Sequence, residues 1–240
     1  MRGAICRIDV LRDSKSMSRG TGTLVAPGIV LTALHLVADR HASPPRFFNG
    51  PITLTFPGHK TLGHVHGLGA ADDWVLLVCE SPPPAIPVPL GRLTQSHVEW
   101  ETHGFPDSDP VNGELQAGTV EDYRGAVEGV AAFQLQGDEA VMGDGALAKG
   151  LSGAPVIVAG WMVGHLRNTE MADGQSMAGR MYACPAGTVA GRYPQLLTLG
   201  DVSHRRSVAP EPARPWIRWA VLVGVVLAVT GVVLLRTCAK

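Results

Sequence analysis

Residues 20–38 read GTGTLVAPGIVLTALHLVA, and this stretch favours a β fold over a helical one. A Gly- and Thr-rich start leads into a short apolar run, a Pro-Gly pair provides a turn, and a second apolar run follows. The pattern predicts two strands, at 21–26 and 29–33. The second strand leads into Thr-Ala-Leu-His, so His35 is expected at a strand end, where the sheet can hold its side chain rigidly.

Short apolar runs separated by Gly, Pro, Asn and Asp continue along the first 200 residues, which favours an all-β protein. Further strands are expected at 4–11, 52–56, 61–66, 74–79, 98–103, 115–120, 130–136, 155–159 and 161–166. The segment SPPPAIPVPLGRL at 81–93 is predicted to be an extended connector, because its prolines exclude a helix or a central strand. We therefore expect two β-barrels, at about 1–82 and 92–200.

The composition narrows the class of protein. Hydrophobic residues make up 45% of the chain and charged residues 17%, which is typical of a folded domain. Six of the 20 basic and two of the 21 acidic residues follow residue 200, so the first 200 residues carry a net charge of −5. This argues against a nucleic-acid partner. The sequence shows no metal or phosphate motif, so we expect no metal and no cofactor. Four scattered cysteines favour reduced thiols over a disulfide framework.

The C-terminal segment is strongly apolar. Residues 219–235 read WAVLVGVVLAVTGVVLL and contain no charge. With its flanks, the segment at 216–236 can cross the ~30 Å hydrocarbon core of a bilayer as a helix. We predict a transmembrane helix there, preceded by a Pro- and Arg-rich linker at 201–215 and followed by a short tail at 237–240.

The flanks of this segment predict its orientation. The N-terminus of the chain lacks the continuous apolar run of a signal peptide. More basic residues precede the C-terminal apolar segment than follow it, and those that precede it are arginines. The positive-inside rule then predicts a single-pass protein with a C-terminal anchor and a cytoplasmic body. Gly224 and Ala228 are four residues apart, and small residues at this spacing are compatible with a homodimer that forms through the membrane helix.

Two further segments contain residues that can assist nucleophilic chemistry. Residues 71–78 read ADDWVLLV, so two aspartates precede a strand that looks buried, and burial suits a carboxylate that orients a histidine. Residues 149–156 read KGLSGAPV, where Ser152 lies between glycines. The amides of Gly150 and Ser152 can converge on one point, because glycine permits unusual backbone angles. A serine hydroxyl needs a base, which His35 can supply.

Together these motifs resemble the chymotrypsin/trypsin-like serine protease superfamily, in the style of short bacterial trypsin-like peptidase domains and HtrA-type proteases. TALH is similar to TAAH around the family histidine, DWVLL to DxALL around the aspartate, and GLSGAPV to GxSGGPV around the serine. GWMVGHL at 160–166 resembles the strand that lines the substrate cleft, and HGFP at 103–106 resembles the turn that opens the second barrel. The resemblance covers about residues 3–200 and implies two six-stranded antiparallel β-barrels of the trypsin type.

The resemblance also implies a role for each matching residue. Ser152 attacks the scissile carbonyl, His35 takes its proton and later donates it to the leaving amine, and Asp73 orients His35. Asp72 is the alternative to Asp73. The backbone amides of Gly150 and Ser152 form the oxyanion hole.

The same comparison places four further residues at the substrate: Ala146, Lys149, His165 and Leu166. Ala146 lies six residues before the nucleophile, where a preference for Arg or Lys would require a carboxylate. His165 has a second interpretation as a simply buried residue, and Lys149 as a solvated surface residue.

Two positions depart from the family pattern. Leu151 stands where digestive relatives have an aspartate that pairs with a newly cleaved N-terminus, so zymogen activation of that kind is not expected. Ala154 replaces a glycine. The sequence therefore predicts a membrane-tethered serine endopeptidase for regulated cleavage of an intracellular protein or peptide. The alternative is an inactive protease-fold module that recruits a partner protein to the membrane. The sequence does not decide whether the protein also binds a regulatory partner protein.

Overall fold

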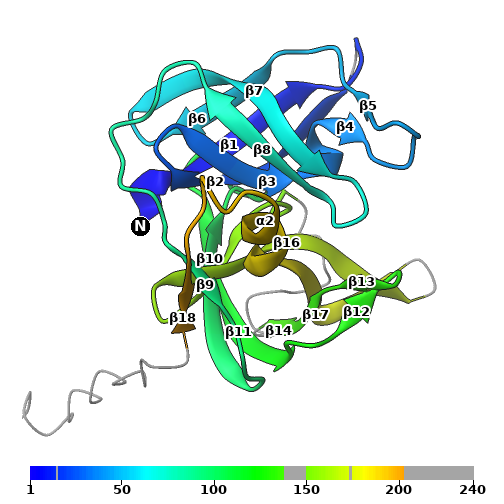
Figure 1. The fold of residues 1–240 in the computed structure, drawn as a ribbon. Helices are drawn as coiled ribbons and strands as arrows, with labels where there is room; N and C mark the ends of the chain where they lie inside the picture. Colours follow the sequence, from blue (N-terminus) through cyan, green and yellow to red (C-terminus); the bar gives the residue numbers. More distant parts are fainter. Residues whose placement is uncertain (15, 138–149, 173–174, 203–240) are drawn as a thin grey trace, which may run out of the picture. The chain divides into compact units, whose positions relative to one another are not determined.

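Two sheets make up most of the residues that the computed structural model describes, which are 1–14, 16–137, 150–172 and 175–202. The first sheet is a closed antiparallel barrel with the strand order β1–β2–β3–β8–β7–β6 (Figure 1). Its strands are β1 (Ile5–Leu11), β2 (Met17–Ala26), β3 (Ile29–Ala33), β6 (Ile52–Phe56), β7 (His59–Gly69) and β8 (Trp74–Cys79).

The hairpin predicted from residues 20–38 is the β2–β3 pair of this barrel. Leu24 pairs with Val30, and the turn between the strands places Gly28 at φ +71°. A positive φ is a conformation that glycine adopts without steric cost, which explains the Pro-Gly turn. The barrel interior is filled by apolar side chains, among them Ile8, Leu24, Val30, Leu54 and Leu77.

The second sheet also contains a six-stranded antiparallel barrel, in the order β15–β10–β11–β14–β17–β16, and it closes because β15 also pairs with β16. Its strands are β10 (Val98–Gly104), β11 (Glu114–Asp122), β14 (Phe133–Gly137), β15 (Pro155–Val158), β16 (Trp161–Ala172) and β17 (Gln175–Pro185). Two short strands, β9 (Leu90–Arg92) and β18 (Leu199–Asp201), extend this sheet beside β16 with parallel pairing.

Short elements complete the described part of the chain. They are the 3₁₀ turns η1 (Arg2–Ala4) and η2 (Leu34–Leu36), the helix α2 (Ala186–Arg192), and the two-stranded pairs β4 (Ala38–Asp39) with β5 (Arg46–Phe47) and β12 (Ala126–Val127) with β13 (Val130–Ala131). The all-β prediction with two six-stranded barrels is confirmed. Cys6, Cys79 and Cys184 are buried free thiols.

Three details of the sequence prediction need correction. The connector at 81–93 does contain a strand, β9, because the last of its prolines is Pro89 and the residues after it keep their amide protons. The strand expected at 130–136 is two strands, β13 and β14, that belong to different sheets. β17 and α2 were not expected, because their sequences contain too few apolar residues in a regular pattern.

No helix among the described residues is long and apolar enough to cross a membrane. The transmembrane helix predicted at 216–236 lies outside the described residues, as do Gly224 and Ala228 and almost all of the linker at 201–215.

Candidate active site

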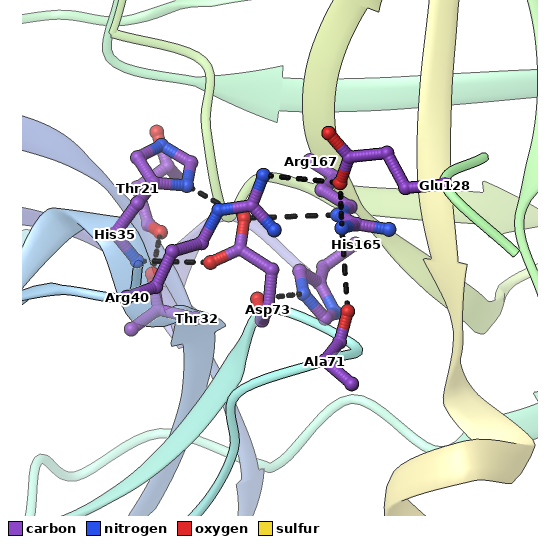
Figure 2. Close-up of polar contacts among 9 residues, drawn as sticks. All are labelled: Thr21, Thr32, His35, Arg40, Ala71, Asp73, Glu128, His165 and Arg167. Atoms are coloured by element: carbon purple, nitrogen blue, oxygen red, sulfur yellow. Dashed lines mark hydrogen bonds and ion pairs between the residues drawn. The ribbon is translucent and has the colours of Figure 1, made fainter. Parts of the chain in front are cut away.

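His35 and Asp73 meet because the strands that carry them are neighbours. β3 pairs antiparallel with β8, and Ala33 at the end of β3 faces Trp74 at the start of β8. His35 follows in η2, and its ring Nδ1 lies 2.7 Å from Asp73 Oδ2 (Figure 2). The backbone amide of His35 also donates to Asp73 Oδ1 at 2.9 Å. One carboxylate therefore holds both the backbone and the ring of the histidine.

The geometry distinguishes Asp73 from its neighbour Asp72. Asp73 has a φ of +57° and its side chain is 1% exposed, so its carboxylate turns inward toward His35. Asp72 instead accepts an ion-pair contact from Arg192 Nη2 at 3.2 Å. A positive φ is uncommon for residues other than glycine, although Asp tolerates it better than most. The sharp turn at Asp73 is what directs these adjacent carboxylates to different partners.

The electrostatic surroundings keep Asp73 ionised. Burial alone would raise the pKa of the Asp73 carboxyl, but the hydrogen bond and charge of His35, together with the charge of Arg40, outweigh burial and lower it. An ionised carboxylate can only accept hydrogen bonds, so His35 Nδ1 carries the proton that faces it. In the neutral ring, the other nitrogen, Nε2, is the one that can accept a proton. The His35 side chain is 32% exposed, so a ligand in the cleft can reach it.

Ser152 lies in a tight turn before β15 and lines the same cleft as His35 and Asp73. Both glycines beside it have positive φ, +94° at Gly150 and +80° at Gly153. A Cβ at Gly150 would stand 2.8 Å from Phe105 O. Any other residue at either position would be strained, so the glycines of the motif are explained by the turn itself. No hydrogen bond joins Ser152 to His35 among the described residues.

The amides predicted to form an oxyanion hole are those of Gly150 and Ser152. Both residues line the cleft, and neither amide donates a backbone hydrogen bond to another described residue. The side chain of Leu151 between them is buried in the core of the second barrel. An apolar anchor thus holds this turn in place.

Thr21 is a residue that the sequence analysis missed. It lies fully buried in β2 of the first barrel and contacts the serine turn of the second. Its amide donates to Ser152 O at 2.9 Å, and its hydroxyl donates to Gly150 O at 3.3 Å and accepts from the Phe105 amide at 2.9 Å. Thr32 Oγ1 in turn donates to Thr21 O at 2.6 Å. Thr21 therefore joins the first barrel to the serine turn of the second.

The residues predicted to contact substrate have different positions. Leu166 lines the cleft, and its backbone pairs with the serine turn through the Gly153 amide at 2.7 Å. His165 is 0% exposed and lies beneath the cleft, where its Nε2 is 3.3 Å from Asp73 O. His165 therefore contacts Asp73 and is not among the residues that line the cleft, and its predicted contact with substrate stays a prediction. Ala146 and Lys149 lie outside the described residues.

The burial of His165 predicts a pH dependence of stability. Burial lowers the pKa of the His165 ring from 6.5 to about 4, despite the Asp73 carbonyl and charge beside it. Between these values the unfolded chain binds a proton that the folded chain does not, so stability falls as the pH falls from 6.5 to about 4. The shift corresponds to about 3 kcal/mol. Asp73 contributes only at lower pH, because its lowered pKa affects stability below 3.8.

We expect His165→Leu to remove this dependence. The wild-type chain should lose about 3 kcal/mol more free energy of unfolding than the variant between pH 7 and pH 4. Urea denaturation of the full chain at a series of pH values measures the difference. His64→Gln is the control, because His64 is 62% exposed and pairs with Glu80 at the surface. Parallel pH profiles for wild type and His165→Leu would contradict the prediction.

Comparisons with known proteins agree with this architecture. The model of the family described as "Trypsin-like peptidase domain" matches residues 20–164. No curated protein matches the chain. Among solved structures, the Rv3671c protease from M. tuberculosis in its active form superposes with a TM-score of 0.63 at 19% identity, covering 83% of each chain. The HtrA-type protease AlgW with tripeptide gives a TM-score of 0.63 at 18% identity, covering 81% of this chain and 60% of that one. At these sequence identities, the structural similarity shows a shared fold.

Proposed function

Since the chain belongs to the trypsin-like peptidase domain family, we propose that it is a serine endopeptidase that cleaves peptide bonds through an acyl-enzyme. The observation that carries the proposal is the 2.7 Å contact between His35 Nδ1 and the buried Asp73 carboxylate, beside Ser152 in one cleft. A serine hydroxyl becomes nucleophilic when a base is held within reach and is itself oriented by a third group.

The proposed reaction uses these residues in turn. Ser152 Oγ attacks the scissile carbonyl carbon while its proton passes to His35 Nε2, and Asp73 stabilises the imidazolium that forms. The amides of Gly150 and Ser152 stabilise the developing oxyanion. His35 then protonates the leaving amine, the C–N bond breaks, and the acyl group stays on Ser152. Water attacks this ester with His35 again as base, which releases the acid and restores the serine.

The substrate is proposed to be a protein or peptide, and the domain to be tethered by the apolar segment at 216–236. The length of this uncharged run supports the tether, and the excess of arginines on its N-terminal side supports a cytoplasmic body. The second candidate function is the inactive module that recruits a partner to the membrane. It is favoured by the missing hydrogen bond between Ser152 and His35, although such bonds often tighten only when substrate binds.

The experiment that tests the proposal is labelling of the purified full chain with a fluorophosphonate probe, which reacts with activated serines. We expect wild type to be labelled and both Ser152→Ala and His35→Ala to lose the label, because one removes the nucleophile and the other its base. Circular dichroism shows whether each variant is folded.

Asp72→Asn is a matched control, because its carboxylate contacts Arg192 and not His35. Labelling that persists in Ser152→Ala would assign the reactive group elsewhere. A folded wild type without labelling, in detergent and in vesicles alike, would favour the partner-recruiting module.

A further inference from the structure

Arg167 is a buried cation with unused hydrogen-bonding capacity. It lies on β16 with its side chain 1% exposed, and its Nε stands 3.8 Å from Asp73 Oδ2. Its Nη2 donates to Ala71 O at 3.3 Å and to Glu128 Oε2 at 3.2 Å. Its Nε and Nη1 have no hydrogen-bond partner among the described residues. Buried donors without partners are costly, so this guanidinium has two donors that a further carboxylate would stabilise.

Glu128 brings a second arginine to the same point. Its Oε2 also lies 3.4 Å from Arg40 Nη2, so one carboxylate oxygen is shared between two guanidinium groups. Figure 2 shows the Glu128 carboxylate where Arg40 and Arg167 converge, next to Asp73. Arg40 follows β4 and Arg167 belongs to β16, so their proximity depends on the packing of the two barrels.

Glu128 itself is held in an unusual way. It lies in the turn between β12 and β13, has a φ of +55° although it is not glycine, and its side chain is 60% exposed. The carboxylate therefore reaches the buried Arg167 from the solvent side. A carboxylate on another molecule that displaces the Glu128 side chain would approach along the same direction.

The charges around the cleft point to the same kind of ligand. Four arginines line the cleft that contains Ser152, against two aspartates, and one of these is Asp73, which already binds His35. The first 200 residues of the chain are acidic overall, so this cationic lining is local to the cleft. An excess of arginines over aspartates in a cleft favours ligands that carry negative charge.

We propose that Arg167 and Arg40 form a carboxylate subsite that selects peptides with an Asp or Glu side chain near the scissile bond, and that Glu128 occupies it in the absence of substrate. This substrate class rests on the proposed peptidase function. Arginine suits the role because its planar fork of donors matches a carboxylate, and such charge-assisted hydrogen bonds are stronger than neutral ones. Glu128 then acts as an intramolecular competitor that an acidic peptide displaces.

Peptide binding tests the subsite without requiring turnover. The full chain carrying Ser152→Ala is titrated into two fluorescein-labelled peptide pools and followed by anisotropy. Both pools are randomised without Asp or Glu, around a central residue that is fixed as Glu in one and Gln in the other. We expect the Glu pool to bind about tenfold more tightly, because only the carboxylate makes charge-assisted bonds to the arginines. Equal affinities for the pools would overturn the proposal.

Variants assign the preference to named residues. Arg167→Gln and Arg40→Gln should each bring the ratio of the two affinities close to one. If Arg167→Gln does not fold, Arg40→Gln still tests the subsite, because Arg40 is more exposed than Arg167. Glu128→Gln should tighten binding of the Glu pool alone, because it removes the competitor. Glu99→Gln, an exposed glutamate outside the cleft, is the matched control. If the Glu pool binds the Glu128→Gln variant no more tightly than it binds the Glu99→Gln variant, the proposed role of Glu128 is wrong.

Fluorophosphonate labelling of the wild-type chain separates this proposal from the peptidase function. Labelling together with equal binding of the two pools would leave the peptidase standing and remove the subsite. Preferential binding of the Glu pool without labelling would support the subsite in a chain that is not a peptidase.

Discussion

Asp73→Asn should lower the rate constant for fluorophosphonate labelling of Ser152 by about 10⁴-fold, the loss that this change causes in serine protease triads. The side-chain amide keeps the size of the carboxylate, and asparagine tolerates the positive φ of +57° at this position. The fold should therefore survive, and only the chemistry of the hydrogen bonds to His35 changes.

The expected loss follows from the tautomer of His35. The carboxylate of Asp73 accepts both the ring proton and the backbone amide proton of His35, at 2.7 Å and 2.9 Å. An amide placed there can donate its own proton to Nδ1, which moves the ring proton to Nε2. A protonated Nε2 cannot receive the proton of Ser152 Oγ. The variant also lacks the negative charge that stabilises the imidazolium in the transition state.

Asp72→Asn is the control for this experiment. It makes the same chemical change one residue away, at a carboxylate that contacts Arg192, so its labelling rate should stay close to that of wild type. The rates come from labelling time courses at several probe concentrations. Similar rates for Asp73→Asn and wild type would show that Ser152 does not depend on the His35–Asp73 pair.

Gly153→Ala should lower the free energy of unfolding by about 4 kcal/mol, the second large effect. At φ +80°, an added Cβ would collide with Thr21 O and Thr32 Oγ1 and approach Ala33 N to 3.0 Å. These neighbours belong to the strands of the first barrel, so they cannot yield without opening the junction of the barrels. The collision adds to the strain that any L side chain has in the left-handed region.

Gly160→Ala separates these two contributions. Gly160 has nearly the same φ, +83°, but a Cβ there has no heavy atom within 4 Å. It should therefore cost only the backbone strain, about 1 kcal/mol. Urea denaturation of both variants measures the difference. Equal losses for the two would mean that the serine turn adapts freely, contrary to the packing seen around Gly153.

Local sequence was sufficient for much of the fold. The apolar runs predicted β6 and β8 with their observed bounds, and the Pro-Gly pair predicted the turn between β2 and β3. These features depend on neighbours in the chain, because alternation and turn chemistry act over a few residues. β17 and α2 escaped prediction, since pairing with β14 and β16 and packing against the barrel stabilise them more than their own sequence does.

For the candidate site, the sequence by itself determined which residue types are available. It singled out His35 at a strand end, a pair of aspartates before a strand, and Ser152 between two glycines whose positive φ the turn requires. Their catalytic roles remain a prediction that labelling tests. Only the tertiary structure decided that Asp73 and not Asp72 contacts His35, because a single backbone angle directs the two side chains apart.

Tertiary structure alone also brought Thr21 to the serine turn and Glu128 to Arg40 and Arg167. Arg167 is separated from its partner Glu128 by 39 residues, and Thr21 from Gly150 by 129. In the sequence, an arginine that is buried beside Asp73 cannot be distinguished from one at the surface. Its burial and its partners are set by the packing of two closed barrels against each other, an interaction between residues far apart in the chain that local patterns do not encode.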